Sequence, residues 1–271
     1  MPWAIEVIKQ DQPRGAFHSA LFDFDGTISL IRQGWQDIMV PYFTEVVQVT
    51  PGGQGDPDVP RLVREFIDLL TGKQTIYQCI RLAEEVAARG GQPLEPTQYK
   101  DEYHRRLLEK IQHRRDDLAA CRLQPDDWMV PGARAWLDTL RARGVKCYLA
   151  SGTDHQYVME EAALLQLTDC FDGGIYGAQD DFKTFSKAKV IERIIRDNRL
   201  EGAALLGFGD GYVEIENVVE VGGYAVGCAT DEEKRVGIDE WKRPRLIAAG
   251  AAAIIPDFSD TQALEAYFLH G

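Results

Sequence analysis

Two aspartates separated by one residue follow a short apolar run near the N-terminus. The run Ala20-Leu21-Phe22 is typical of a buried strand, and the turn after it contains Asp23, Asp25, Gly26 and Thr27. Open α/β sheets place their chemistry at the carboxyl ends of their strands. The Thr27 hydroxyl and the nearby amides can hold an anion, but two carboxylates repel an anion unless a cation neutralises them. The stretch therefore indicates a bound metal ion, and these residues alone leave an ordinary Asx-rich turn open as the alternative.

Two later apolar runs also end in polar turns of small residues. Residues 145–150 lead into Ser151-Gly152-Thr153, and residues 203–207 lead into an acidic loop from Gly207 to Glu214. If the three runs are neighbouring strands of a parallel sheet, their turns meet along one edge. Each turn is a weak signal by itself. Together they supply carboxylates, hydroxyls and glycine amides, and a helix expected from residue 187 adds a lysine.

The pattern of helices and strands divides the chain. Beyond residue 127, strands alternate with helices of 10–15 residues, which indicates an α/β fold with a parallel sheet. Residues 30–125 show helical periodicity and no clear strand, so an all-helical insertion is expected after the first core strand. The predicted domains are 1–28 with 128–271, and 29–127. The expected elements include helices at 30–47 (broken or kinked by Pro41), 217–221 and 238–249, and a strand at 171–175.

Composition limits the partners of the protein. A chain of 271 residues with 45% hydrophobic and 27% charged residues is typical of a globular protein with one large domain or two modest ones. The net charge of −13 argues against nucleic acid or an anionic membrane surface as a partner, but a local cation still permits a small anionic substrate. No apolar signal core and no run of 18 apolar residues is found, so a cytoplasmic location is expected. The sequence gives no indication of oligomeric state.

In residue type, order and spacing, these motifs resemble the haloacid dehalogenase superfamily of phosphatases. The first motif is Asp23–Thr27, the second is Ser151 with Gly152 and Thr153, the third is Lys187, and the fourth is Gly209-Asp210-Gly211 followed by Glu214. The resemblance covers about 18–28 and 128–271. It implies a Rossmann-like three-layer core with an inserted helical cap of the C1 type, as in phosphoglycolate phosphatases and β-phosphoglucomutases.

The resemblance also implies a role for each motif residue. Asp23 would be the nucleophile that forms an aspartyl-phosphate, and Asp25 would be the general acid and then the general base. Ser151 and Lys187 would complete the catalytic set. The groups expected to bind the phosphate are Gly26, Thr27, Ser151, Gly152 and Lys187. Lys183, in the preceding loop, remains an alternative to Lys187, which the expected N-cap Ser186 would place in the first turn of its helix.

A Mg²⁺ ion is the cofactor that the resemblance implies. Its ligands would be Asp23, the backbone carbonyl of Asp25, and Asp210, because a hard ion prefers oxygen donors. Glu214 departs from the commoner form of the fourth motif, in which the second acid is an aspartate. Glu214 would bind the metal, directly or through water, or orient Lys187; a solvated loop acid is the alternative.

The implied activity is a Mg²⁺-dependent phosphatase that hydrolyses a small phosphorylated metabolite, such as a sugar phosphate or a phosphoglycolate-like acid. A phosphosugar mutase of the β-phosphoglucomutase type is the alternative. A non-catalytic binding module is disfavoured because both catalytic aspartates are present. Arg32, Lys73 and Thr75 are candidates for substrate contact from the cap. The basic run from Arg105 to Arg115 is expected to be a solvated helix face.

Overall fold

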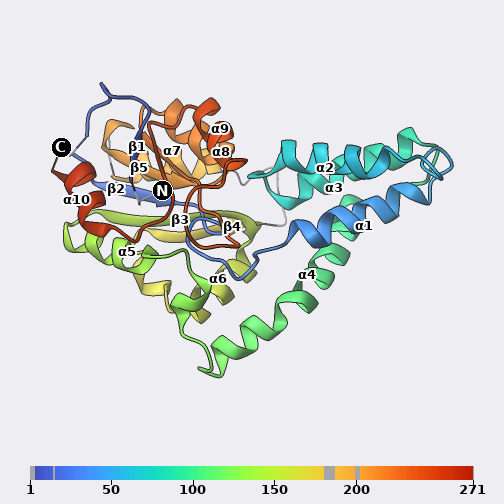
Figure 1. Ribbon diagram of the computed structural model, residues 1–271, viewed down its shortest axis with the longest axis horizontal. Helices are drawn as coiled ribbons and strands as arrows, with labels where there is room; N and C mark the ends of the chain where they lie inside the picture. The colour runs from blue at the N-terminus through green and yellow to red at the C-terminus, as the bar shows by residue number, and fades with distance from the viewer. Residues whose placement is uncertain (1–3, 15, 180–186, 199–201, 271) are drawn as a thin grey trace. The chain divides into compact units, whose positions relative to one another are not determined.

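The chain forms two compact units. The computed structural model describes residues 4–14, 16–179, 187–198 and 202–270 (Figure 1). Met1–Gln33 together with Arg114–Gly271 forms one unit, here called the core unit, and Gly34–His113 forms the other, here called the helical unit. The first division, at 33/34, lies five residues after the expected boundary at 28/29. The second, at 113/114, lies fourteen residues before the expected boundary at 127/128. Backbone hydrogen bonds explain the shift, because Leu30 donates to Trp128 and Val130 donates to Ile28 within the core unit.

A seven-stranded sheet runs through the core unit, and it confirms the predicted α/β class. Its strand order is β1-β7-β6-β5-β2-β3-β4. Only β1, at one edge, is antiparallel to its neighbour; the other pairs described are parallel. The strands are β1 (Glu6–Val7), β2 (Ser19–Phe22), β3 (Lys146–Asp154), β4 (Gly174–Ala178), β5 (Leu205–Gly209), β6 (Tyr224–Cys228) and β7 (Ala253–Ile255).

Helices connect the parallel strands of the core unit, and one more helix follows the last strand. They are α5 (Ala133–Ala142), α6 (His155–Leu164), α7 (Lys187–Asn198), α8 (Tyr212–Glu220), α9 (Lys242–Ala248) and α10 (Thr261–Leu269). Short 3₁₀ turns lie at Pro125–Trp128, Thr168–Cys170 and Gly202–Ala204. None of the helices in the described part of the chain is long and apolar enough to cross a membrane.

Three predicted elements of the core unit have different bounds. The predicted helix at 238–249 begins only at Lys242, because Ile238 forms a bridge with Thr230 and the Asp239 carboxylate accepts from the Trp241 amide. The strand predicted at 171–175 is β4, which starts after a turn in which the Gly174 amide donates to the carbonyl of residue 171. The short helix predicted at 217–221 is α8, which begins five residues earlier.

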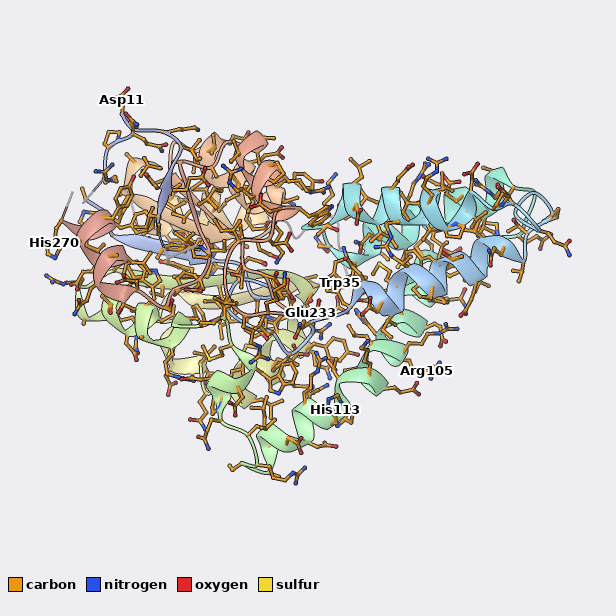
Figure 2. The ribbon with its side chains drawn as sticks, viewed as in Figure 1. Asp11, Trp35, Arg105, His113, Glu233 and His270 are labelled. Carbon is orange, nitrogen blue, oxygen red and sulfur yellow. The ribbon has the colours of Figure 1, made fainter. Side chains whose placement is uncertain are left out.

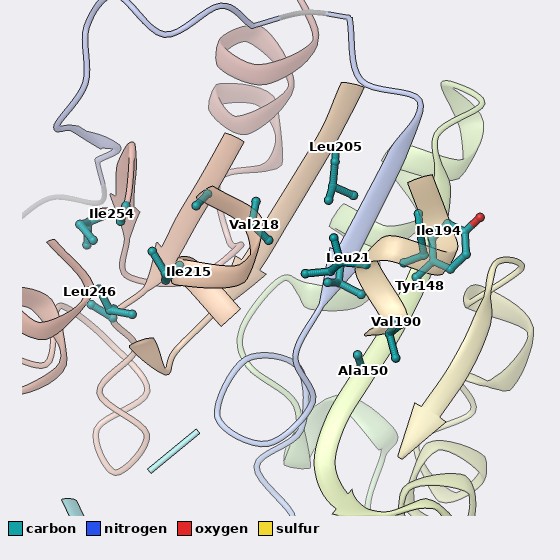
Figure 3. Packing of buried hydrophobic residues seen from close by; sticks show 14 residues of the cluster. Leu21, Tyr148, Ala150, Val190, Ile194, Leu205, Ile215, Val218, Leu246 and Ile254 are labelled. Carbon is teal, nitrogen blue, oxygen red and sulfur yellow. The ribbon is translucent and has the colours of Figure 1, made fainter. Parts of the chain in front are cut away.

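The sheet is buried on both faces. Successive strand residues point to opposite faces, so Leu21 and Phe22 serve different layers. Leu21 belongs to an aliphatic cluster with residues of α7, α8 and α9, including Val190, Ile215 and Leu246 (Figure 3). Phe22 stacks on Phe208 with ring centroids 4.7 Å apart, in an aromatic cluster that also contains Trp136, Phe258 and Phe268. Burial of these large side chains supplies the main stabilisation of the core unit.

Four helices form the helical unit. They are α1 (Gln36–Gln48), α2 (Val59–Leu70), α3 (Thr75–Ala88) and the part of α4 (Pro96–Ala119) that ends at His113. The Phe43 and Phe66 rings pack 6.1 Å apart in its interior. The prediction of a helix from residue 30 was wrong, since residues 31–35 form turns. Of the two alternatives predicted at Pro41, the break is wrong, because α1 continues through Pro41, which lies between the buried side chains of Val40 and Tyr42; the kink stays a prediction.

Two arginines in the basic run of α4 make different kinds of contact. Arg105 lies on the surface of α4 (Figure 2) and pairs with Glu102 and Glu109, so the predicted solvated face is confirmed there. Arg114 differs, because its guanidinium donates to the carbonyls of Ile31 and Gln33 within the core unit.

Gly132 and Gly144 allow a matched test of backbone strain and packing. Both have φ of +76°. A Cβ on Gly132 would lie 2.1 Å from the Phe258 carbonyl oxygen, whereas a Cβ on Gly144 would meet nothing within 4 Å. Gly144→Ala should therefore lower the free energy of unfolding by about 1 kcal/mol through strain alone, and Gly132→Ala by about 2–4 kcal/mol. Urea unfolding measures both, and equal losses would contradict the packing argument.

Candidate functional site

The register of β2 brings the three predicted turns together. Within the sheet, Phe22 is paired with Leu149 of β3 on one side and with Phe208 of β5 on the other. The Asp23 amide continues this ladder by donating to the Phe208 carbonyl at 2.9 Å. The first, second and fourth motifs therefore begin side by side at the carboxyl edge of the sheet, as the sequence predicts.

The turn after β2 is compact and requires glycine. The amides of Ile28 and Ser29 both donate to the Phe24 carbonyl, at 2.9 and 2.8 Å, and the Gly26 amide donates to the Ser29 carbonyl. Gly26 has φ of +80°, and a Cβ there would lie 2.3 Å from Oδ2 of Asp210. The carboxylate of the fourth motif thus lies directly against the backbone of the first motif. Only glycine permits both the conformation and this close approach.

The Asp25 carboxylate accepts hydrogen bonds from the second motif. Thr153 donates its hydroxyl hydrogen to Oδ2 of Asp25 at 2.8 Å, and the Ser151 hydroxyl lies 3.4 Å from the same oxygen. Ser151 also accepts from the Thr153 amide at 3.0 Å, next to a register irregularity between β3 and β4. Both hydroxyls of the second motif therefore face Asp25. The sequence assigned the Ser151 hydroxyl to the phosphoryl oxygens and gave no contact to Thr153.

The pKa of Asp25 is raised from 3.8 to about 7. Burial is the main cause, and the charges of Glu161 and Asp23 act in the same direction. Arg32 and the Thr153 hydroxyl oppose the shift. A carboxyl group that keeps its proton near neutral pH is suited to general acid catalysis.

Arg32 lies in the core unit and has a buried partner. Its guanidinium makes a bidentate pair with Glu161 of α6, at 3.0 and 2.9 Å, and its Nε lies 3.9 Å from Oδ1 of Asp25. The Arg32 side chain is 6% exposed and that of Glu161 is fully buried. Glu161 was missed by the sequence analysis. It lies 129 residues from Arg32, on α6, where a glutamate gives no local sign of being buried.

Lys242 is a second buried cation, beside the fourth motif, and the sequence did not predict its contacts. The Lys242 ammonium donates to Asp210 at 2.8 Å and to Glu232 at 2.6 Å. Burial by itself would lower the pKa of Lys242, but the charges of Asp210 and Glu232 and the two hydrogen bonds raise it above its usual value. Lys242 is the first residue of the short helix α9, and nothing in the sequence around it indicates this contact.

The remaining predicted residues have different surroundings. Glu214 is buried in the first turn of α8, against Gly209. Thr27 is buried, and its Oγ1 has no hydrogen-bond partner among the described residues. The side chain of Lys187, at the start of α7, lies outside the described part of the chain, as do Lys183 and Ser186. Lys73 is exposed and Thr75 is half-buried at the start of α3, in the helical unit.

The donor set at this edge fits a hard divalent cation. The charges of Asp210 and Asp23 both raise the pKa of the buried Cys228 thiol, after burial itself, so both carboxylates lie near the same point. No group of three or more His, Cys, Asp and Glu side chains in the described ranges forms a metal site. Two carboxylates and a backbone carbonyl do not require such a group, because Mg²⁺ usually retains several waters.

The sequence model of the haloacid dehalogenase-like hydrolases matches residues 18–217, which is more than half of the chain. A search of curated proteins found no match.

Several solved structures share the fold at low identity. A predicted phosphoglycolate phosphatase from Haemophilus somnus is 16% identical, with a TM-score of 0.59, over 92% of this chain and 98% of that one. β-Phosphoglucomutase from Clostridium difficile is 15% identical, with a TM-score of 0.57, over 86% and 98%. A Deinococcus radiodurans hydrolase with bound phosphate and sodium is 16% identical, with a TM-score of 0.55, over 93% and 96%.

The raised pKa of Asp25 predicts how the stability of the protein depends on pH. Between pH 3.8 and about 7, the folded protein keeps a proton on Asp25 that the unfolded chain releases, so this group lowers stability as pH rises through that range. Asn cannot ionise. The stability of Asp25→Asn relative to wild type should therefore increase by roughly 1–3 kcal/mol from pH 5 to pH 8.

Urea unfolding with EDTA present measures this difference. Asp138→Asn, at an exposed aspartate of α5, is the matched control and should show no such trend. A stability difference for Asp25→Asn that is independent of pH, or that falls as pH rises, would contradict the assignment.

Proposed function

Because the chain belongs to the haloacid dehalogenase-like hydrolases, we propose that it is a Mg²⁺-dependent phosphatase of small phosphorylated metabolites. The observation that carries the proposal is the meeting of Asp23, Asp25 and Asp210 at one sheet edge, with the Asp25 carboxyl held by hydroxyls of the second motif. A phosphomonoester needs a nucleophile, a proton donor for its leaving oxygen and positive charge for its phosphoryl oxygens. The chain has residues for each requirement.

The reaction divides into two steps. In the first, a carboxylate oxygen of Asp23 attacks phosphorus, and the bond to the leaving oxygen breaks as Asp25 gives that oxygen its proton. In the second, Asp25 accepts a proton from water, the water oxygen attacks the phosphorus of the aspartyl-phosphate, and the Asp23 carboxylate is released with inorganic phosphate. Ser151 and the amides near Gly26 and Thr27 are the proposed phosphate contacts. Lys187 is proposed to balance the charge of the phosphoryl group.

The metal would be held by Asp23, the backbone carbonyl of Asp25, and Asp210. When bound, Mg²⁺ would neutralise charge on the phosphoryl oxygens and on the carboxylate that attacks phosphorus. Lys242, which is also paired with Glu232, donates to Oδ2 of Asp210, so the other carboxylate oxygen of Asp210 would be the one that holds the metal. Glu214 is proposed to act through water or on Lys187.

The helical unit is proposed to be the cap that selects the substrate. Its position in the sequence, between the first and second motifs, supports this role, since a closing cap excludes water from the reacting groups. Lys73 and Thr75 are the proposed substrate contacts within it. The sugar-phosphate and phosphoglycolate classes are both compatible with the fold, and cytoplasmic action is proposed for such metabolites.

The nucleophile can be tested by an isosteric change. Asp23→Asn should lower Mg²⁺-dependent phosphate release from 4-nitrophenyl phosphate by at least about 10³-fold, because an amide oxygen is a poor nucleophile and a poor metal ligand. The melting temperature should stay close to that of wild type. EDTA should abolish wild-type turnover and added Mg²⁺ should restore it. Asp138→Asn is the control, and wild-type turnover by Asp23→Asn would refute the assignment.

A mutase is retained as a second function because β-phosphoglucomutase is among the structural neighbours. A panel of phosphorylated sugars and acids, incubated with Mg²⁺ and with or without a sugar bisphosphate, separates the two. A phosphatase releases inorganic phosphate in stoichiometric amounts. A mutase converts a sugar phosphate to its isomer, requires the bisphosphate and gives no net phosphate release. We expect phosphate release, and isomer formation without it would overturn the phosphatase.

A further inference from the structure

The Arg32–Glu161 pair is a buried ion pair beside the proposed general acid, Asp25. Arg32 uses Nε and Nη2 on the two oxygens of Glu161, at 3.0 and 2.9 Å. The Tyr157 ring, one helical turn before Glu161, packs on the guanidinium with its centroid 5.3 Å away. The guanidinium is therefore fixed in position by a carboxylate and an aromatic ring, both from α6.

The two oxygens of Asp25 have separate neighbours. Oδ2 accepts from the Thr153 hydroxyl at 2.8 Å, and Oδ1 faces Nε of Arg32 at 3.9 Å. Oδ1 is buried and accepts no hydrogen bond from the described residues. The carboxyl plane is thus limited on one side by the second motif and on the other by the guanidinium, and Glu161 determines where that guanidinium lies.

We propose that Arg32 and Glu161 are positioning residues that hold the Asp25 carboxyl in the orientation from which it gives its proton to the leaving oxygen. This inference rests on the proposed phosphatase function. It changes the role predicted for Arg32, since a guanidinium that is 6% exposed and committed to Glu161 is not available to grip a substrate.

Charge explains why the pair contains both residues. A buried guanidinium with no partner would be costly, and Glu161 supplies that partner through both of its carboxylate oxygens. Paired in this way, the guanidinium lies 3.9 Å from Oδ1 of Asp25 without donating a hydrogen bond to it. A well-packed apolar pair would stabilise the fold at least as well as a buried ion pair, so stability alone gives no reason for charge here.

The test compares leaving groups. The 4-nitrophenolate anion departs without a proton, whereas phenolate needs protonation as the bond breaks. Glu161→Gln should therefore lower kcat/KM for phenyl phosphate by about 10²-fold or more, the usual contribution of a placed acid, and by less than about 5-fold for 4-nitrophenyl phosphate. A purely structural defect would lower both values by the same factor.

A double variant keeps the test valid if Glu161→Gln does not fold. Arg32→Met with Glu161→Gln removes both charges and leaves no unpaired buried ion. It should show the same selective loss with phenyl phosphate, and the effects of the two changes should not add, because both act through Asp25. Melting temperatures confirm that each variant is folded.

Glu265→Gln is the matched control. Glu265 of α10 also pairs with an arginine, Arg143 at the end of α5, with Nε 2.7 Å from Oε1. This variant should keep both wild-type kcat/KM values. Parallel losses with the two substrates in folded Arg32 and Glu161 variants, or no loss, would overturn the positioning role. A wild-type protein inactive on both substrates would instead refute the proposed phosphatase.

Discussion

The site depends on one strand that is paired in parallel on both sides. Four residues of β2 are bonded to β3 and to β5 in matching register, so the backbone at Asp23 has no freedom to shift relative to either neighbour. A slip of one residue would send Phe22 into the aliphatic layer and Leu21 into the aromatic one. The packing of the two layers therefore fixes the register, and the register fixes where Asp23, Ser151 and Asp210 emerge. The packing of the core and the positions of the site residues therefore depend on the same strand register.

Charge compensation is the second requirement of this sheet edge. The chain carries a net charge of −13 and gathers several carboxylates around one turn. Two buried cations neutralise part of this negative charge. Arg32 is paired with Glu161, and Lys242 is paired with both Asp210 and Glu232. Both cations are thus paired with carboxylates of the core unit. This pairing is consistent with a divalent ion and a further lysine as the charges that meet the substrate.

The sequence predicted the elements that local pattern controls. Buried apolar runs followed by polar turns identified β2, β3 and β5, and parallel pairing was enough to place Asp23, Ser151 and Asp210 together. The sequence did not predict contacts between segments that lie far apart in the chain. Glu161 occupies a helix position typical of an ordinary surface acid, and Lys242 lies 32 residues after Asp210, at the start of α9. Periodicity reports which face a residue occupies, whereas a buried ion pair depends on how two elements pack.

The same distinction explains the domain boundaries and gives them a consequence. Helical periodicity from residue 30 suggested that the insertion starts there, but residues 28–33 are bonded to the core unit. Ser29 bridges to both Asp25 and Met129, and Arg114 donates to the carbonyls of Ile31 and Gln33. The segments that leave and re-enter the core unit are thus joined to the turn that carries Asp25. Backbone hydrogen bonds within the core unit, and not helical periodicity, therefore set where that unit ends.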